Sequence, residues 1–501
     1  MSSSKTPSDD SHFSSLFGSE FDVTRARSLT STNTIKQSAD CVLLWMNRDQ
    51  RVQDNWAMVA GCKLAKIKKV PLKVVFGCFP TFGSMSTRQY NFMFEGLKEV
   101  EKELIDLKIP FEVVCGDPGV EVLKYAKSSN PVAVLTDFFP LRNCNEWSTA
   151  VASGLDSVSV PLIQIDAHNV VPAWLASDKQ EVGARTLRPK IHKVYQKYLT
   201  RFPPVEPNPE GTKMPTPTDW TSVMKSISSE VEVTTIPDTF KPGKSAGMSV
   251  FSSFCESRLK NYADNRNDPN LHVQSDMSPY IRFGQVSFQR LALSIRDLKR
   301  HSSGTAAYIE EGVVRRELAD NYCLYNDNYD NLNGAAGWAR ESLMLHSTDK
   351  REYIYTKTQL ESAQTHDDLW NAAQIQLVEE GKMHGFLRMY WAKKILEWTP
   401  SPENALEWGL YLNDKYSFDG SCPNGYVGVG WSVMGIHDMG WKEREVFGKI
   451  RFMNYNGCKR KFKVGEFVQN YPQASVNAIA QGGEKSKDPA PRKNKKQKVS
   501  K

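Results

Sequence analysis

Residues 41–170 alternate short apolar runs with longer amphipathic segments, and this alternation constrains the fold more than any other feature. Runs of strand length that are rich in β-branched and aromatic residues predict buried strands at residues 41–46, 72–79, 111–115, 132–138 and 162–165. Segments with helical periodicity between them predict helices at residues 56–69, 88–107 and 120–127. Repeated β-α units of this size are typical of a parallel sheet that helices cover on both faces. We therefore expect an α/β domain over residues 39–175.

The first turn of this domain lacks the glycines that bind phosphate in related folds. A dinucleotide-binding Rossmann fold carries G-x-G-x-x-G in that turn, but residues 46–51 read MNRDQR. The Gly-Lys-Ser at residues 243–245 lacks the upstream glycine of a Walker A motif. The domain is therefore expected to be Rossmann-like, with the phosphate fingerprint missing.

A proline-rich stretch separates this domain from a second one. Residues 203–242 hold eight of the 26 prolines, a density that prevents a continuous helix and suits a surface crossing. We expect an interdomain linker over residues 176–247 and an all-helical domain over residues 248–470. Its helices are predicted at residues 250–261, 288–300, 306–325, 369–380 and 386–397. The flanking segments, residues 1–38 and 471–501, are expected to be disordered.

Most of the net charge of +7 lies at the C-terminal end. Residues 484–501 carry eight Lys or Arg and two acids, a net charge of +6. Such a segment is typical of a nuclear-localisation signal or a non-specific nucleic-acid arm, and the alternative is a solubilising end. We expect a nuclear protein, or one in another DNA-containing organelle. A folded body that binds nucleic acid must then use a local basic patch.

The nine cysteines are scattered and contain no C-x-x-C pair. This spacing argues against a zinc site and a disulfide framework, and for a reducing compartment. No apolar run approaches the length of a transmembrane helix, and residues 1–40 have no apolar signal-peptide core. We therefore expect neither a metal site nor a membrane partner.

Three tryptophans in the helical domain have a spacing that suits electron transfer. Trp391 and Trp398 are seven residues apart in one predicted helix, so they lie two turns apart on one face. Trp370, in the preceding helix, is placed to pack beside them. Indole is readily oxidised, so a file of such rings can pass an electron. Aromatic residues at helical spacing are also typical of core packing, and the spacing alone leaves both interpretations open.

Two other segments have local features that suit a ligand. Ser278 and Pro279 are predicted as the N-cap and first residue of a helix, whose free N–H groups can hold a phosphate. Residues 420–440 contain six glycines with Trp431 and Trp441, which predicts a loop that approaches a flat ligand and an indole that stacks on a base. The alternatives are a well-capped helix and a structural loop with a solvated basic face.

Longer motifs resemble one family. Residues 370–398, WNAAQIQLVEEGKMHGFLRMYWAKKILEW, closely resemble the class II cyclobutane pyrimidine dimer (CPD) DNA photolyases of the photolyase/cryptochrome superfamily. The resemblance extends through residues 183–193, 277–287, 310–326, 351–356, 411–420 and 425–441. It covers roughly residues 40–470, the whole predicted globular body.

The resemblance implies that an antenna-type α/β domain is joined by a long linker to the helical domain. The helical domain would hold FAD in a folded, U-shaped conformation, and the active form of this cofactor would be FADH−. The positions that match cofactor contacts are Tyr262, Ser275, Met277, Ser278, Arg388, Asp419 and Asn413. Arg388 and Asp419 match an ion pair against the isoalloxazine, and Asn413 matches an asparagine beside its central-ring nitrogen. Trp391, Trp370 and Trp398, in that order outward from the flavin, match the photoreduction relay. A second, light-harvesting antenna chromophore stays open, since no motif establishes one.

On the substrate side, Glu311 matches the acid that hydrogen-bonds the damaged bases. Met389 matches a residue lining the same pocket, and Trp431 matches a ring that packs on the flipped dimer. Positions that touch the DNA around the lesion match Arg266, Trp441 and Arg451. Many other photolyases have a Trp three residues after the equivalent of Glu311, where this chain has Val314 followed by Arg315. The pocket wall must therefore be completed differently.

The implied function is light-driven repair of UV-damaged DNA by a monomeric carbon–carbon lyase. Excited FADH− donates an electron to the CPD, the cyclobutane ring splits, and the electron returns. A crosslinked dinucleotide pairs and stacks poorly, so flipping it out costs less than flipping intact bases. The alternatives are a cryptochrome-like photoreceptor without repair, a light-independent flavoprotein or nucleic-acid-binding module, and a (6-4) photoproduct specificity. The presence of Glu311, Met389 and Trp431 argues against the photoreceptor.

Overall fold

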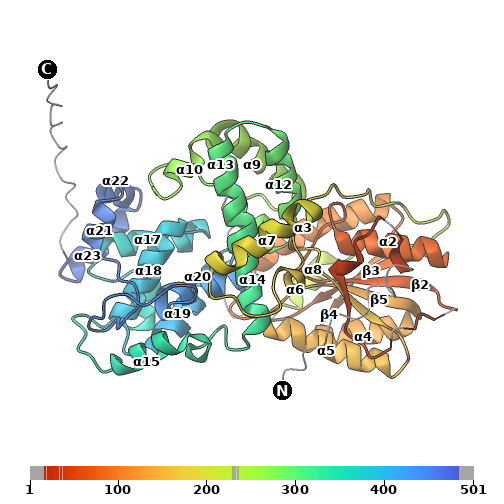
Figure 1. Ribbon diagram of the computed structural model, residues 1–501, viewed down its shortest axis with the longest axis horizontal. Helices are drawn as coiled ribbons and strands as arrows, with labels where there is room; N and C mark the ends of the chain where they lie inside the picture. The colour runs from red at the N-terminus through yellow and green to blue at the C-terminus, as the bar shows by residue number, and fades with distance from the viewer. Residues whose placement is uncertain are drawn as a thin grey trace.

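The computed structural model describes residues 16–483 apart from residues 19, 33, 37, 228–232, 234–235 and 238. An α/β part and a helical part lie side by side along the long axis of the molecule (Figure 1). The expectations for residues 1–15 and for the basic segment 484–501 lie outside the described residues. The division into a Rossmann-like α/β part and an all-helical part is confirmed.

A six-stranded sheet forms the centre of the α/β part. Its strands are β1 (Ala26–Ser28), β2 (Cys41–Met46), β3 (Leu72–Cys78), β4 (Phe111–Cys115), β5 (Pro131–Asp137) and β6 (Leu162–Ile165). They run in the order β1-β6-β5-β2-β3-β4, and only β1 is antiparallel to its neighbour. The strands predicted from apolar runs are present at the expected places.

Strand β1 corrects the expectation of disorder through residue 38. Ala26 pairs with Ile165, and Ser28 pairs with Ile163, so β1 extends the edge of the sheet. The sequence of β1, ARS, has no strand pattern of its own. Its backbone is ordered because the free edge of β6 supplies hydrogen-bond partners, which a local pattern does not reveal.

Helices cover both faces of the sheet, as the β-α alternation predicts. They are α2 (Trp56–Lys68), α3 (Thr87–Asp106), α4 (Pro118–Ser128) and α5 (Arg142–Asp156). Successive side chains of a strand point to opposite faces. Val42 and Leu44 accordingly join the core that includes α2 and α3, whereas Leu43 and Trp45 join a separate core with α4 and α5.

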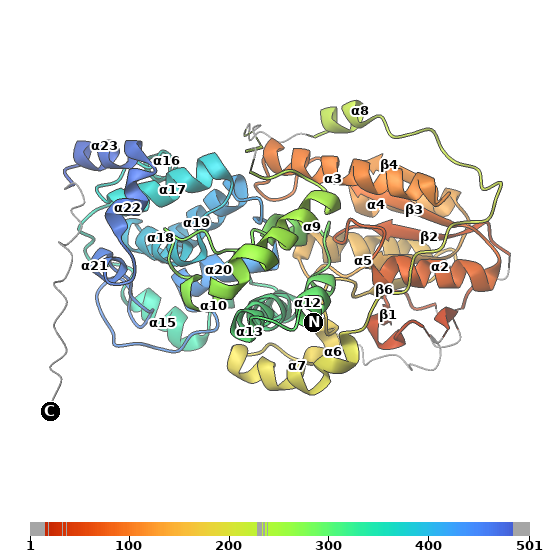
Figure 2. The same cartoon turned by 90° about the horizontal axis from the view of Figure 1, so that it is seen from above.

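The expected linker is more ordered than its prolines predict. It follows α6 (Ala173–Ala176) and contains α7 (Ala184–Tyr198) and α8 (Trp220–Lys225). The segment around α8 runs along the outside of the α/β part (Figure 2). Glu101 of α3 holds it there, because its carboxylate accepts hydrogen bonds from the Thr218 N–H and the Trp220 indole N–H. These contacts are long-range in sequence, so composition alone does not indicate them.

The helical part contains the predicted helices and several more. It consists of α9 (Lys244–Ser253), α10 (Leu259–Asn265), α11 (Ser278–Arg282), α12 (Phe288–Asp297), α13 (Ser302–Ile309), α14 (Arg316–Tyr325), α15 (Gly337–Leu345), α16 (Lys357–Glu361), α17 (Asp368–Glu380), α18 (Gly385–Trp398), α19 (Pro402–Tyr416), α20 (Pro423–Met434), α21 (Tyr455–Lys459), α22 (Val464–Gln469) and α23 (Pro472–Ala480). Two π-helical turns, η2 (Phe254–Arg258) and η3 (Glu310–Arg315), interrupt longer helices. A 3-10 turn, η4 (Leu332–Gly334), also lies in this part, and another, η1 (Val23–Arg25), directly precedes β1 in the α/β part.

Helix α23 corrects the expectation of disorder from residue 471 onward. It packs against α17, and its Ala474 and Ala478 are fully buried. Small side chains allow two helices to approach closely, and the burial depends on the partner helix rather than on α23 itself. None of the described helices combines the length and apolar character that a membrane crossing requires.

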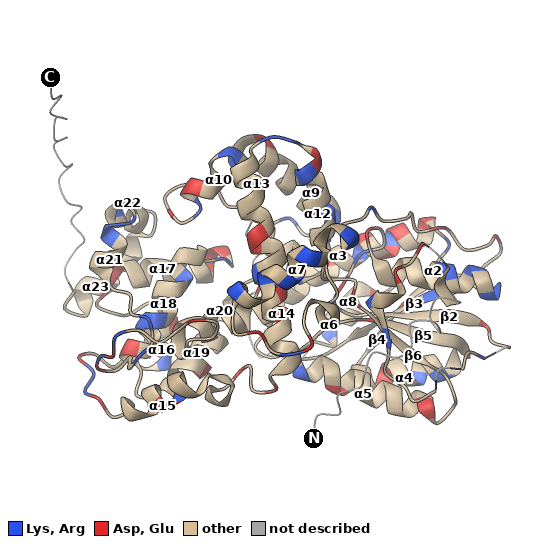
Figure 3. Ribbon diagram, in the orientation of Figure 1, with Lys and Arg blue, Asp and Glu red and all other residues tan. Residues whose placement is uncertain are grey.

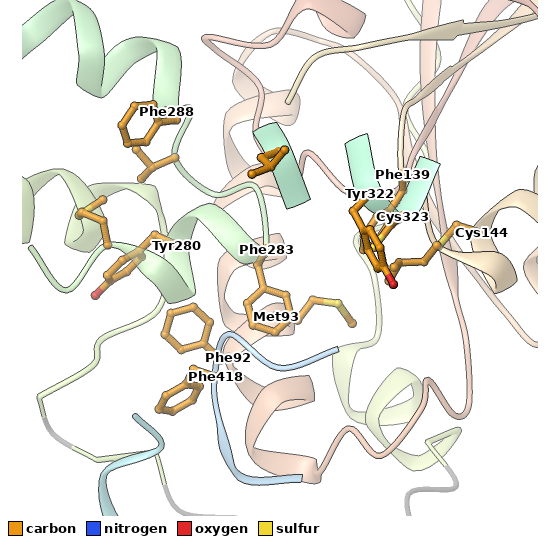
Figure 4. Close-up of a cluster of buried hydrophobic side chains, with 14 of the residues drawn as sticks. Phe92, Met93, Phe139, Cys144, Tyr280, Phe283, Phe288, Tyr322, Cys323 and Phe418 are labelled. Atoms are coloured by element: carbon orange, nitrogen blue, oxygen red, sulfur yellow. The ribbon is translucent and has the colours of Figure 1, made fainter. Parts of the chain in front are cut away.

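Aromatic packing joins the two parts into one continuous core. Phe92 of α3 contacts Tyr280, Phe283 and Phe418 of the helical part, with ring centroids 5.6, 5.6 and 5.1 Å away (Figure 4). A buried ion pair adds to this interface, since the two terminal guanidinium nitrogens of Arg48 donate to Asp320 at 2.7 and 2.9 Å. The helical part is therefore held in a fixed position against the sheet.

Candidate functional site

The three tryptophans form a continuous file of buried rings. Trp391 of α18 stacks on Trp370 of α17, with ring centroids 6.3 Å apart and planes 7° apart. Trp370 then contacts Trp398 edge-on at 5.8 Å. The Trp370 indole N–H donates to the Trp391 carbonyl oxygen at 3.0 Å, and the Trp391 indole N–H donates to Gln374 at 2.8 Å. These bonds fix the rings in an order that matches the predicted one, although the role of the file stays a prediction.

Aromatic residues that the analysis of spacing missed continue the file beyond Trp398. The rings of His366 and Tyr355 lie 5.1 and 5.7 Å from that of Trp398, and Tyr355 and His366 share a hydrogen bond of 2.7 Å. Trp398 also borders a pocket of about 400 Å³, which Tyr353 and Arg444 help to line. The file thus runs from the interior of the helical part to an open pocket.

A polar cluster lies beside the inner end of this file. Arg388 is three residues before Trp391 in α18, so the two side chains share a helix face. Its guanidinium donates to Asp419 at 3.0 Å. Burial raises the pKa of Asp419, but the Arg388 charge and hydrogen bonds from Ser417 and Ser278 outweigh it and lower the pKa to about 2. The predicted ion pair is therefore present and ionised at neutral pH.

Two further features of this cluster leave hydrogen-bonding capacity free for a ligand. The Nε atom of Arg388 is buried and has no hydrogen-bond partner. Asn413 of α19 is buried and donates to Asp414 at 3.1 Å, and its amide lies close to Gly425 of α20. A Cβ built at Gly425 would approach the Asn413 nitrogen to 3.0 Å. Glycine at this position therefore keeps the surroundings of the amide uncrowded.

A second cluster joins residues predicted for the cofactor, the DNA and the lesion. Arg266 and Glu311 form an ion pair of 2.7 Å, with side chains 30% and 37% exposed. The Arg266 guanidinium lies 6.0 Å from the Tyr262 ring centroid, and burial together with the Glu311 charge raises the pKa of Tyr262 to about 12. The tyrosine is therefore a neutral hydroxyl at physiological pH. The direct contact between Arg266 and Glu311 was not predicted.

The π-helical turn η3 sets the position of Glu311. One extra residue in the turn rotates the side chains that follow, and such turns are frequent at functional sites. Gly312 is required here, because a Cβ would lie 1.7 Å from the ring of Phe288. Val314, where the resemblance led us to expect a Trp, is fully buried in the core, and the following Arg315 pairs with Glu310 at 3.3 Å.

The predicted N-cap at Ser278 is wrong by one residue. Met277 occupies the N-cap position, no side chain caps the helix, and α11 is only five residues long. Ser278 instead lies beside the Asp419 carboxylate, whose pKa it helps to lower, and the Ser275 hydroxyl accepts a hydrogen bond from the Met277 N–H at 3.5 Å. Ser278 therefore links α11 to the Arg388–Asp419 pair. Local sequence favours the cap, but the carboxylate of Asp419 competes for the hydroxyl.

The glycine-rich segment 420–440 forms helix α20 over much of its length, and the expectation of a loop is wrong there. Gly435, with a φ of 71°, ends the helix in the left-handed conformation. A Cβ at Gly430 would lie 2.4 Å from Ile436, so this glycine admits the returning chain. Helix α20 packs against α18 and α19. The glycines of this segment thus allow close packing of α20, in addition to the close approach to a flat ligand that the sequence predicts.

Predicted DNA-contacting residues gather at the end of α20. The guanidinium of Arg451 lies 5.9 Å from the ring of Trp431 and 5.1 Å from that of Trp441, and Trp441 is half-exposed. Met389, next to Arg388 in α18, is half-buried. Elsewhere Lys and Arg are distributed over both parts of the molecule (Figure 3). Because most of the net positive charge lies in residues 484–501, the sequence predicts a local basic patch on the folded body rather than a strongly basic body.

Lys393 is a member of this group that sequence analysis missed. Its side chain is fully buried, its ammonium donates to the Ser432 carbonyl oxygen at 3.1 Å, and it lies 5.0 Å from the Trp431 ring centroid. Burial lowers the pKa of Lys393 to about 7, against the opposing charge of Asp438. The helix sequence AKK carries no signal that one of the lysines is buried.

The described residues contain no group of three or more His, Cys, Asp or Glu side chains that could hold a metal ion. The family model for DNA photolyase matches residues 42–210. A deoxyribodipyrimidine photo-lyase from Potorous tridactylus is 48% identical over 456 residues, which cover 91% of this chain and 85% of that protein.

Other relatives and solved structures agree. A deoxyribodipyrimidine photo-lyase from Arabidopsis thaliana is 46% identical, covering 87% of this chain and 90% of that protein. A bacterial class III photolyase from Agrobacterium tumefaciens superposes with a TM-score of 0.67 at 15% identity, covering 91% and 95% of the two chains. A cryptochrome from Synechocystis gives a TM-score of 0.64 at 17% identity, covering 89% of each. At such low identity the structural likeness concerns the fold alone.

Proposed function

This chain belongs to the DNA photolyase family, and we propose that it is a light-driven repair enzyme that splits cyclobutane pyrimidine dimers in DNA. The observation that carries the proposal is the continuous file of Trp391, Trp370 and Trp398, which starts beside the Arg388–Asp419 pair. A half-buried ion pair next to an oxidisable file of rings suits a redox cofactor. No such pairing is needed for core packing alone.

FAD is the cofactor that the cluster fits. The buried Nε of Arg388 has a free hydrogen to donate, and a Cβ at Gly385 or Gly428 would meet nothing within 4 Å, so these positions face open space. Arg388, Asp419 and Asn413 would contact the ring system. Residues that would hold the ribityl and phosphate portions are Tyr262, Ser275, Met277 and Ser278. When bound in its reduced form, FADH− supplies on illumination the electron that opens the cyclobutane ring.

The residues around this site have separate tasks. Asp419 stays ionised and keeps the Arg388 guanidinium charged and oriented. The Asn413 amide would lie beside the central-ring nitrogen of the isoalloxazine, where it would respond to a change in protonation of the reduced form. The file of rings passes an electron inward from the pocket beside Trp398 and so maintains the reduced state.

The lesion is bound by a different set of residues. Glu311, held by Arg266, presents carboxylate oxygens that accept hydrogen bonds from the N–H edge of a flipped pyrimidine. Trp431 provides a flat apolar surface for the crosslinked pair, beside Met389. Arg451 and Trp441 contact the DNA next to it. Contacts of this kind give sequence-independent, salt-sensitive affinity.

The test is repair of dimer-containing DNA by the purified protein in light and in darkness. We expect a flavin absorption spectrum, photoreduction by visible light with a reductant, and repair only under illumination. A flavin-loaded, photoreducible protein that leaves the dimers intact in light would instead be a photoreceptor of the cryptochrome type. The same spectrum reports whether an antenna pigment is present, through absorption that flavin does not account for.

We also propose a nuclear location, on the basis of the basic residues 484–501. A fluorescent fusion of the full chain should accumulate in nuclei, and a fusion ending at residue 483 should not. Equal distribution of the two fusions would contradict the proposal.

A further inference from the structure

Two cysteines meet at the carboxyl ends of neighbouring parallel strands. Cys78 is the last residue of β3, Cys115 is the last residue of β4, and the two are paired in register. The Gly116 N–H donates to the Cys78 carbonyl oxygen at 3.0 Å, so pairing continues to the strand ends. Neighbouring strands lie about 4.7–4.9 Å apart, within the Cα separation of about 4.4–6.8 Å that a disulfide requires.

The side chains of this pair lie next to each other, because residues paired in register on neighbouring parallel strands project to the same face of the sheet. Each of the two sulfurs shifts the pKa of the other. Cys78 is fully buried, whereas Cys115 is exposed. All nine cysteines of the chain are free, but most are buried. The pair thus combines one sulfur that solvent can reach with a second sulfur directly behind it.

The pKa values of the two thiols are shifted in opposite directions, so that one sulfur is ready to attack an oxidant and the other is not. The interaction with the neighbouring Cys78 thiol lowers the pKa of Cys115 to about 6, against the opposing effect of burial. The neighbouring Cys115, together with burial, raises the pKa of Cys78. By contrast, burial raises the pKa of Cys62 to about 12. At neutral pH Cys115 is therefore a thiolate and Cys78 a thiol, and thiolates are the nucleophilic form.

We propose that Cys78 and Cys115 form a peroxide-reactive pair that closes to a reversible intramolecular disulfide. Exposed thiolates with a second cysteine beside them are the typical arrangement of redox-sensing cysteines. The site lies in the α/β part, whereas the residues assigned to flavin and lesion lie in the helical part. The proposal therefore stands independently of the proposed function.

The chemistry balances with hydrogen peroxide as the oxidant. The Cys115 thiolate attacks one peroxide oxygen, the O–O bond breaks, and the hydroxide that leaves takes up a proton to become water. Cys115 is then a sulfenic acid. The Cys78 sulfur loses its proton and attacks the Cys115 sulfur, which forms the S–S bond and releases a second water. Two thiols are oxidised, one peroxide is reduced to two waters, and a dithiol reductant reverses the change.

The experiment treats the full-length protein with hydrogen peroxide, blocks remaining thiols with an alkylating agent, and maps peptides by mass spectrometry. We expect a linked peptide pair containing Cys78 and Cys115, with a mass lower by two hydrogens, and its loss after treatment with dithiothreitol. Cys115→Ser should abolish the linkage. Cys78→Ser should keep Cys115 reactive but leave it as sulfenic or sulfinic acid, because the resolving sulfur is missing.

Cys62→Ser is the matched control, since Cys62 is half-buried in the same part of the chain and its thiol donates to the Glu206 carbonyl oxygen at 3.7 Å rather than pairing with a second cysteine. This variant should form the linkage as the wild type does. If Cys78→Ser does not fold, Cys78→Ala and the pH dependence of Cys115 alkylation, with an expected midpoint near 6, provide the same test. Free Cys78 and Cys115 after peroxide treatment, or a linkage between other cysteines, would overturn the proposal. Repair activity should be unchanged by Cys115→Ser.

Discussion

The indole planes of Trp370 and Trp391 lie within 7° of each other, with ring centroids 6.3 Å apart, although the residues belong to different helices. A hydrogen bond from the Trp370 indole to the Trp391 backbone sets this arrangement. Trp370 also contacts Trp398, so it is the middle member of the file. Removing it separates the inner ring from the outer one.

Trp370→Phe should slow photoreduction of the bound flavin by roughly tenfold or more, because phenyl is much harder to oxidise than indole and each tenfold step corresponds to about 1.4 kcal/mol of barrier. Repair by protein that has been reduced chemically beforehand should be unchanged. Absorption spectra during illumination measure the first quantity. Trp408→Phe, a partly buried ring of α19 outside the file, is the control. Equal photoreduction by wild type and Trp370→Phe would show that the file is core packing only.

Glu311→Gln should lower the rate of dimer repair by about 10- to 100-fold, since a hydrogen bond to a charged group contributes about 1.5–3 kcal/mol. Binding of undamaged DNA and photoreduction should be retained. Single-turnover repair assays measure the effect. The neighbouring Glu310→Gln is the control, because Glu310 pairs with Arg188 and Arg315 instead. An equal loss of repair in both variants would point to a disturbed η3 turn rather than to the Glu311 carboxylate.

Arg451→Ala should weaken DNA binding and make it less sensitive to salt, lowering the slope of log affinity against log salt concentration by about 1 if Arg451 contacts one phosphate. Fluorescence anisotropy over a range of salt concentrations gives this slope. Lys127→Ala, an exposed position on α4, should leave the slope unchanged. A slope unaffected by Arg451→Ala would remove this residue from the DNA interface.

Asp320→Asn should lower the free energy of unfolding by roughly 3–5 kcal/mol, because it leaves the buried Arg48 guanidinium without its counter-charge. Thermal and denaturant unfolding measure the change. Asp297→Asn is the control, since its partner Arg201 is exposed and such surface pairs contribute roughly 0–1 kcal/mol. A similar small effect in both variants would mean that the interface between the two parts does not depend on this pair.

Acidification from about pH 6.5 toward pH 4 should destabilise the protein, in part through His168. Burial and the Arg48 charge lower the pKa of His168 to about 4, so the folded state binds fewer protons than the unfolded state in this range. The stability that neutral His168 contributes is present above the unfolded pKa and is lost as the pH falls through the folded one. His168→Gln should therefore flatten the fall in melting temperature between pH 6.5 and 4, and His192→Gln, exposed on α7, should not. Identical profiles for wild type and His168→Gln would contradict this assignment.

Strands β2, β4 and β6 have the bounds predicted from sequence. The apolar run of β2 is continuous, as expected of a strand buried on both faces, whereas the runs of β4 and β6 are mainly apolar with one polar residue each. Strand β1 and helix α23 were missed because their short polar or small-residue sequences are ordered by partners elsewhere in the chain. For the same reason, segment 420–440 was interpreted as a loop, although packing against α18 and α19 holds it as a helix.

Individual site residues were identified by their resemblance to a family, and their chemical character follows from their side chains. The contacts between them were not predictable in this way. The Arg266–Glu311 pair, the partners of Ser278 and the burial of Lys393 beside Trp431 each join separate elements.

The amino-acid sequence by itself determined the alternation of strands β2 to β6 with helices, the division into two parts and the identity of the reactive side chains. Only the tertiary structure decided which of those side chains touch, which are ionised and which two cysteines meet at the strand ends. The reason is physical. Periodicity depends on neighbours along the chain, whereas ring contacts, ion pairs and pKa shifts depend on distances and burial that arise when distant elements pack together.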